Sequence, residues 1–252
     1  MEKAQNIAEN SAKYGFLNAN VLKIVALFAM TIDHVGYIFF PEVEVLRLIG
    51  RLAFPIFAFF IAEGCRYTRN KWRYFGLIFV LGLLFEVFAR FVGHTEDCNI
   101  FITFSLSILL IYLLMWAKKS IKEKNKKMAS ISSIAFFVAV AAVYVLTVVL
   151  PPYTARLTSV DYGFWGVMVP VFVALFDWHY AKVIMFAFGL VLMCALRSPM
   201  WLDQWFCLIT VPLIMWYNGE RGKYRLKYLF YVYYPAHLVL LYGILELIHL
   251  NT

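Results

Sequence analysis

The sequence predicts an all-α membrane protein, a bundle of about nine transmembrane helices. Of its 252 residues, 63% are hydrophobic and only 15% are charged, whereas soluble domains are about 45 to 50% apolar. The apolar residues fall into runs close to the roughly 20 residues that a spanning helix needs. Lys and Arg gather in three of the alternate connections between these runs. Together these observations predict one integral membrane domain over residues 1–252.

The apolar runs define the expected helices in chain order. They are residues 21–40, 46–64, 74–92, 99–117, 129–150, 161–177, 182–196, 200–216 and 227–249. Pro170 and Pro212 lie inside the sixth and eighth segments, where we expect kinks that a helix bundle tolerates. The seventh segment is short for a full crossing. The sequence therefore allows eight to ten spans, with nine as the central prediction.

The connections predict the orientation in the membrane, because cytoplasmic loops hold the excess of Lys and Arg. Three connections are basic: Arg66 to Arg73 after the second segment, Lys118 to Lys127 after the fourth, and Arg221 to Lys227 before the ninth. The alternate connections, PEVEV, GHTEDC, PPYTARLTSVD and RSPM, carry few cations. The polar residues 1–20 have no apolar core of a signal peptide. We therefore expect a cytoplasmic N-terminus and an outer C-terminus.

Charge and cysteine content exclude several function classes. The net charge of +8 sits in short loops and forms no basic arm, so it indicates orientation in a lipid bilayer and not a nucleic-acid partner. Cys65, Cys98, Cys194 and Cys207 have no CxxC or CxxH spacing, so we expect packing thiols and no metal site. No internal repeat is evident, which makes a secondary transporter less favoured.

Five ionisable side chains inside the apolar segments form the candidate catalytic layer. They are Asp33, His34, Arg51, Glu86 and His237. Charged or ionisable groups at membrane depth are costly and usually functional. A helix rises 1.5 Å per residue, so His34 lies about 16 Å beyond Lys23. The same ruler puts Arg51 and Glu86 in the outer half of the bilayer with His34, and His237 near its middle.

Each of these residues has a structural and a functional interpretation. His34 is either a general base, since imidazole titrates near neutral pH, or a histidine that bonds a neighbouring helix. Asp33 points about 100° away from His34, so it is expected to pair with Arg47 or Arg51 and not to orient the imidazole. Arg51 and Glu86 either neutralise one another, or Arg51 stabilises a developing oxyanion.

Basic residues near the predicted cytoplasmic face form a candidate site for a phosphate-bearing ligand. Lys23 and Arg66 lie near that end of the first two segments, and YNGERGKYRLKY contributes Arg221, Lys223 and Lys227. Cations of this kind bind phosphate groups well. The alternative is that they serve only orientation or, for Arg66, snorkel to water.

Four stretches resemble the TraX family of bacterial membrane proteins over about residues 22–241. They are LKIVALFAMTIDHVGYIFFP, IGRLAFPIFAFFIAEG, DYGFWGVMVPV, and YNGERGKY followed by KYLFYVYYPAHL. The resemblance implies acetyl transfer from acetyl-CoA in a bacterial inner membrane, because the founding TraX protein is associated with N-terminal acetylation of conjugative pilin. Lys23 and His34 also resemble the Arg/Lys-x10-His motif of transmembrane acyltransferases that O-acetylate glycans. In that class the histidine is taken as catalytic.

The resulting hypothesis is a membrane acetyltransferase that takes acetyl-CoA from the cytoplasm. His34 acts as base or acyl carrier, while Arg51 and His237 stabilise the oxyanion or position the acceptor. The acceptor is an amine or hydroxyl of a pilin-like N-terminus, a glycan or a lipid. The alternatives are a proton- or ion-coupled transporter with a relay through Asp33, His34, Glu86 and His237, and a non-catalytic membrane assembly factor.

Overall fold

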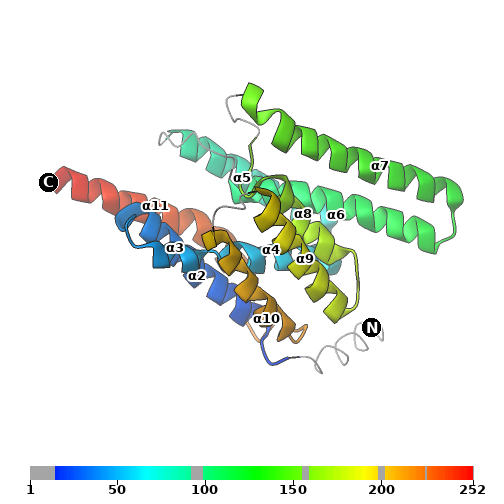
Figure 1. The fold of residues 1–252 in the computed structure, drawn as a ribbon, viewed down its shortest axis with the longest axis horizontal. Coiled ribbons are helices and arrows are strands. Elements are labelled where there is room, and N and C mark those ends of the chain that lie inside the picture. The colour runs from blue at the N-terminus through cyan, green and yellow to red at the C-terminus, as the bar shows by residue number, and fades with distance from the viewer. Residues whose placement is uncertain (1–14, 92–98, 155–158, 198–201, 225, 252) are drawn as a thin grey trace. The chain divides into compact units, whose positions relative to one another are not determined.

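The computed structural model describes residues 15–91, 99–154, 159–197, 202–224 and 226–251 (Figure 1). Across these ranges the chain forms helices and short connections, with no β-strand. One isolated bridge pairs Leu17 with Tyr217. The prediction of an all-α fold is confirmed for the described part of the chain.

Every predicted apolar segment is largely helical. The α-helices are α2 (Ala19–Phe39), α3 (Glu44–Gly50), α4 (Ala53–Tyr67), α5 (Lys71–Phe91), α6 (Ile100–Lys122), α7 (Lys126–Tyr144), α8 (Gly163–Ala174), α9 (His179–Arg197), α10 (Thr210–Met215) and α11 (Lys227–Asn251). Three shorter helical pieces, η1 (Val145–Val149), η2 (Pro151–Tyr153) and η3 (Leu202–Ile209), adjoin α7 and α10.

Five of the described helical segments are long and apolar enough to cross a membrane. They are Ala19–Phe39, Glu44–Tyr67, Ile100–Lys122, Lys126–Val149 and His179–Leu196. Their number and apolar character make this a membrane protein. The count of nine spans and the side on which each terminus lies stay predictions.

The second predicted helix, 46–64, is two helices in the structure. α3 ends at Gly50, and the N–H of Arg51 donates to the carbonyls of Arg47 and Leu48 at 3.3 and 3.2 Å. Pro55, in the first turn of α4, has no N–H, and in a continuous helix its ring would clash with the carbonyl four residues earlier, that of Arg51. The proline therefore explains why the helix stops and restarts around Arg51.

The seventh and eighth segments also differ from expectation. α9 begins at His179, three residues before the predicted start, and its 19 residues make it one of the candidate spans. The prediction that this segment is short was therefore wrong. The eighth segment begins as the 3₁₀-helix η3 and continues as α10, with Pro212 at the third position of the α-helical part.

The chain divides into two compact units, and each is described here by itself. The first unit holds residues 1–57, 179–194 and 198–252. In it α3 folds back on α2, and α11 runs along α2. Leu27, Met30 and Ala53 are buried together, and Tyr233 and Tyr234 of α11 pack against them.

The second unit holds residues 58–178 and 195–197. α6 is central to it, because α5, α7 and α8 all pack against α6. The hydroxyl of Ser107 on α6 donates to the carbonyl of Val167 on α8 at 2.9 Å. This bond holds the short helix α8, of which eight residues are buried. The single membrane domain stays a prediction.

Candidate functional site

The N-terminal end of α2 is held by a loop from the far end of the chain. The backbone N–H groups of Ala19 and Asn20 donate to the carbonyls of Glu220 and Arg221 at 2.8 and 3.2 Å, and the Asn20 side chain donates to the Tyr224 carbonyl at 2.8 Å. The first N–H groups of a helix have no partner inside it, so loop carbonyls supply one here. We call the contact between residues 17–20 and 217–224 the polar joint.

Gly222 makes the polar joint possible. Its φ of 93° lies in the left-handed region that side chains disfavour. A Cβ at this position would also lie 2.7 Å from the Asn18 side-chain oxygen, which caps α2 by accepting from the N–H of Val21 at 3.1 Å. The sequence YNGERGKY therefore forms a turn that fits closely over the start of α2.

From the polar joint, α2 and α11 run side by side in the same direction. Thr31 and His34 of α2 contact Tyr233 and His237 of α11 respectively. Because the Thr31 hydroxyl donates to the Leu27 carbonyl at 2.9 Å, the hydroxyl of Tyr233 donates to Thr31 at 2.7 Å. The parallel direction of α2 and α11 fits an odd number of crossings from the first predicted segment to the last.

His34 and His237, which we call the histidine pair, meet between these two helices. Nδ1 of His34 lies 3.1 Å from Nε2 of His237, and the ring centroids are 4.9 Å apart. His237 is buried at 6% exposure, whereas His34 is half-buried. The ring of Tyr233 stacks on His237 at 5.3 Å with an angle of 12° between the planes. By exposed surface, His237 is therefore buried and His34 half-buried.

The hydrogen bonds of the pair assign the proton positions of the neutral rings. Nδ1 of His237 lies 2.8 Å from the Tyr233 carbonyl, which only accepts, so this nitrogen donates and Nε2 of His237 carries a lone pair. Nδ1 of His34 lies 2.9 Å from the Met30 carbonyl. It therefore donates, sharing its hydrogen between Met30 and His237. The lone pair of His34 is left on Nε2, to which none of the described residues hydrogen-bonds.

Asp33 pairs with Arg47, one of the two partners that the sequence allows. The Arg47 guanidinium donates to Oδ2 of Asp33 at 2.9 Å. It also lies over the ring of Tyr37, 5.2 Å from the centroid. Gly50 packs directly against the Asp33 side chain, so that a Cβ at residue 50 would overlap it. Asp33 thus joins α2 to α3, and its hydrogen bonds are not to the imidazole of His34.

Arg51 forms an ion pair with a residue that the sequence analysis did not single out. Its Nη2 donates to Oδ2 of Asp203 on η3 at 3.0 Å. The Arg51 side chain is 14% exposed and that of Asp203 is 31% exposed. A lone acidic residue at the start of the eighth apolar segment was the available signal. The ion pair links the α3–α4 junction to η3.

The candidate ligand-binding cations in the first unit gather at the polar joint. Arg221 and Lys223 are exposed in the loop, and Lys23 is half-buried one turn into α2. The side chain of Lys227 lies outside the described residues. The histidine pair lies farther along α2, since the 11 residues from Lys23 to His34 span about 16 Å of helix.

Glu86 belongs to the second unit. Its Oε2 accepts from the backbone N–H and the side-chain amide of Asn99 at 3.3 and 3.1 Å. The same Asn99 amide donates to the Gly82 carbonyl at 2.9 Å. These hydrogen bonds connect α5 to the start of α6, so Glu86 has a structural role in the second unit.

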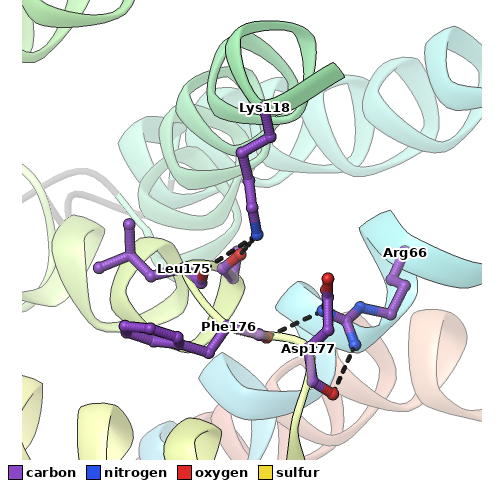
Figure 2. A network of polar contacts seen from close by, with 6 residues as sticks. Arg66, Lys118, Leu175, Phe176 and Asp177 are labelled. Atoms are coloured by element: carbon purple, nitrogen blue, oxygen red, sulfur yellow. Dashed lines mark hydrogen bonds and ion pairs between the residues drawn. The ribbon is translucent and has the colours of Figure 1, made fainter. Parts of the chain in front are cut away.

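Arg66 of α4 also lies in the second unit, and its side chain contacts the residues that follow the C-terminal end of α8 (Figure 2). Its guanidinium donates to the carbonyl of Phe176 at 2.9 Å and forms an ion pair with the carboxylate of Asp177. Nζ of Lys118 donates to the carbonyls of Ala174 and Leu175 at 3.1 and 2.9 Å. Carbonyls at a helix end lack intrahelical partners and attract cations. The two cations therefore cap α8.

Replacing Lys118 by methionine is expected to destabilise the protein by about 1–3 kcal/mol, because two carbonyls lose a charged donor. The measurement is denaturant unfolding of the detergent-solubilised protein, followed by tryptophan fluorescence. The matched control is Lys119→Met. Lys119 is exposed and lies 3.7 Å from Glu123, a surface pair worth at most about 1 kcal/mol. Equal stabilities of the two variants would contradict the capping role.

Depth arithmetic brought the right residues together only in part. It placed His34 and His237 in one layer, and they are hydrogen-bonded. It did not indicate Asp203 as the partner of Arg51, nor Tyr233 and the Met30 carbonyl as the groups that orient the histidine pair. Hydroxyl and carbonyl groups inside apolar helices carry no charge signal, so only the packing of α2 on α11 identifies them.

Comparison with known proteins identifies the family. A family model described as TraX protein matches residues 18–245. The probable fimbrial assembly protein FimC, serogroup H1, of Dichelobacter nodosus is 26% identical over 251 residues, which cover 87% of this chain and 92% of that protein. The uncharacterized protein RP591 of Rickettsia prowazekii (strain Madrid E) is 34% identical over 107 residues, 42% of this chain and 40% of that protein. No solved structure matches.

The family match covers nearly the whole described structure. It includes α2, all of the polar joint except residue 17, and both members of the histidine pair. It therefore confirms the resemblance found in the sequence, and this chain belongs to the TraX protein family.

Proposed function

We propose that this TraX family protein is an acetyltransferase of the bacterial inner membrane, which moves an acetyl group from acetyl-CoA to an amine or hydroxyl acceptor. The observation that supports it best is the histidine pair. Its hydrogen bonds leave Nε2 of the half-buried His34 with a lone pair and without a hydrogen bond from the described residues. A fixed imidazole with an available nitrogen suits a general base.

In this proposal Nε2 of His34 takes the proton of the acceptor amine or hydroxyl as it attacks the acetyl carbonyl. His237 and the Met30 carbonyl hold the His34 ring by Nδ1, so the ring keeps the tautomer that has its lone pair on Nε2. Tyr233 in turn fixes His237 by its carbonyl and its stacked ring. We do not propose that Arg51 stabilises the oxyanion formed during acetyl transfer, because its guanidinium forms an ion pair with Asp203.

The residues at the polar joint fit the phosphate groups of acetyl-CoA. When bound, acetyl-CoA supplies an activated thioester at the end of a long flexible arm. Lys23, Arg221 and Lys223 offer three cations at the end of α2 remote from His34. The N–H groups of Ala19 and Asn20 already bond loop carbonyls, so side chains and not the helix terminus would hold the phosphates.

Acetyl-CoA is expected to raise the Tm of the purified protein, because a ligand that binds only the folded state stabilises it by about 2.7 kcal/mol at 100 times Kd. Lys23→Glu should weaken this binding at least tenfold. Lys119→Glu, a charge reversal on the exposed surface of the second unit, is the control and should leave it unchanged. Thermal shift over a range of acetyl-CoA concentrations is the measurement. Equal binding by both variants would remove Lys23 from the site.

A pilin-like N-terminal amine is the acceptor that we favour. FimC of Dichelobacter nodosus, similar over most of its length, is named as a probable fimbrial assembly protein. A glycan or lipid hydroxyl is the alternative acceptor. Labelled acetyl-CoA given to membranes that contain the protein would distinguish them, since the label appears in a small membrane protein, in a glycan or in the lipid extract.

The name of that relative also supports a second candidate, a non-catalytic factor in fimbrial assembly. In that case the histidine pair serves only to hold α2 against α11. A protein that is stable, assembles fimbriae and neither binds acetyl-CoA nor transfers label would favour this candidate. A transporter with a proton relay would likewise not bind acetyl-CoA. It would instead acidify the lumen of vesicles into which the protein has been reconstituted.

A further inference from the structure

Two cysteines in the first unit lie within contact distance of one another. Sγ of Cys194 on α9 is 3.5 Å from Sγ of Cys207 on η3, and both residues are 0% exposed. A disulfide brings two sulfur atoms to about 2.0 Å, so small side-chain rotations would close the gap. Cys65 is equally buried, but no second sulfur lies against it among the described residues. The burial of Cys65, Cys194 and Cys207 as free thiols agrees with the packing role predicted for the four cysteines, and Cys98 lies outside the described residues.

The sequence places this sulfur pair toward the outer side of the membrane. The connection between α9 and η3 includes RSPM, at residues 197–200, one of the cation-poor connections. Cation-poor loops lie on the non-cytoplasmic side, and disulfides form and persist in the bacterial periplasm. Cys194 lies three residues before the end of α9, and Cys207 lies in the next helical element. Both sulfur atoms are thus near the oxidising compartment.

We propose that Cys194 and Cys207 form a disulfide bond in the mature protein. The oxidant is the disulfide of a periplasmic thiol–disulfide oxidoreductase. The thiolate of one cysteine attacks that disulfide, giving a mixed disulfide and one free thiol of the oxidoreductase. The second cysteine then displaces the other oxidoreductase thiol. Two cysteine thiols are oxidised, one disulfide is reduced to two thiols, and the two protons pass to them.

Burial determines when the exchange occurs. With both sulfur atoms fully enclosed, an oxidoreductase reaches them only before η3 packs on α9. The bond therefore forms during folding and is afterwards protected from reductants while the protein stays folded. This timing distinguishes a structural disulfide from an exposed regulatory one.

The bond would hold an element that has little intrinsic stability. η3 is a 3₁₀-helix of eight residues, whereas such helices rarely exceed three or four residues. It carries Asp203, the ion-pair partner of Arg51. Linking Cys207 to α9 closes a short chain segment and restricts the unfolded state. We therefore expect the disulfide to keep Asp203 in place against the α3–α4 junction.

The test uses the full-length protein with Cys65→Ser and Cys98→Ser, so that only Cys194 and Cys207 remain. Membranes are quenched in acid, denatured and treated with a maleimide carrying polyethylene glycol, with and without prior reduction. We expect a monomer with no added polymer before reduction and two additions after it. Adding Cys194→Ser should give one addition without reduction. One or two additions to the unreduced protein that retains both cysteines would overturn the proposal.

A second measurement avoids dependence on the folding of that variant. Peptide mass spectrometry of the wild-type protein, digested without reductant, should find the peptide with Cys194 joined to the peptide with Cys207. Both peptides alkylated as free thiols would overturn the proposal. A consequence for stability follows as well, since reduction in mild denaturant should lower Tm by about 5 °C or more. None of these outcomes depends on acetyl transfer.

Discussion

Replacing His34 by glutamine is expected to lower acetyl transfer by about 10²–10⁴-fold, the contribution typical of a positioned general base. Glutamine is close to histidine in size and polarity, so it can fill the space beside His237 without providing a basic nitrogen. The measurement is the transfer of label from acetyl-CoA to membrane material, at equal amounts of folded protein. Tm should change little, and the affinity for acetyl-CoA should be kept, because the cations of the polar joint are untouched.

The control for this variant is His179→Gln. His179 is another histidine of the first unit, and its Nε2 lies 3.1 Å from the Met215 carbonyl. It should retain transfer. His237→Gln should show an intermediate loss, since His34 keeps its bond to Met30 but loses the ring that fixes its orientation. Full transfer by a folded His34→Gln protein would exclude the proposed base.

Gly50→Ala is expected to destabilise the protein by about 1–3 kcal/mol, the usual cost of overpacking, and to lower Tm by several degrees. The new methyl group would overlap the Asp33 side chain, including its Cβ. The Asp33 Cβ is fixed by the backbone of α2. The overlap can therefore be removed only if α3 moves away from α2. That movement also strains the Asp33–Arg47 ion pair. Thermal unfolding of the solubilised protein measures the effect.

Gly76→Ala is the matched control, because a Cβ at Gly76 meets nothing within 4 Å. Gly76 lies inside α5, where alanine is about 0.5–1 kcal/mol more favourable than glycine. The two identical changes should therefore shift Tm in opposite directions. If Gly50→Ala also stabilises, the close packing of α3 on α2 around Asp33 does not exist in the protein.

Much of the helical pattern could be predicted because apolar runs in a membrane protein have few alternatives to a helix. The run 21–40 corresponds to α2, shifted by two residues at the start. The run 46–64 shows the limit. It is apolar enough to be predicted as one helix, yet the chain breaks at Arg51, because Pro55 has no N–H and its ring would clash with the Arg51 carbonyl in a continuous helix. A hydropathy average does not detect the missing N–H or the ring. The position of the proline in the sequence does indicate the break.

The sequence predicted how deep in the membrane the candidate site residues lie, but not which side chains face one another. Counting 1.5 Å per residue locates His34 and His237 along their helices, and their meeting agrees with that count. The rotation of each helix about its own axis decides which side chains face one another, and tertiary packing sets it. Asp203 illustrates the difference, since its distance along the chain from Arg51, 152 residues, gives no reason to pair them.

The contact between α2 and α11 has a consequence for how the protein is made. His34 and His237 are 203 residues apart, and ribosomes add about 5–20 residues per second. α2 therefore reaches the bilayer about 10–40 s before its partner helix is synthesised, with Thr31 and His34 still lacking Tyr233 and His237. The helices of the second unit can insert into the membrane in that interval, but the contact between His34 and His237 cannot form until α11 has been made. The candidate catalytic centre is consequently among the last features to assemble, and a stalled or shortened chain would contain most of the helices without it.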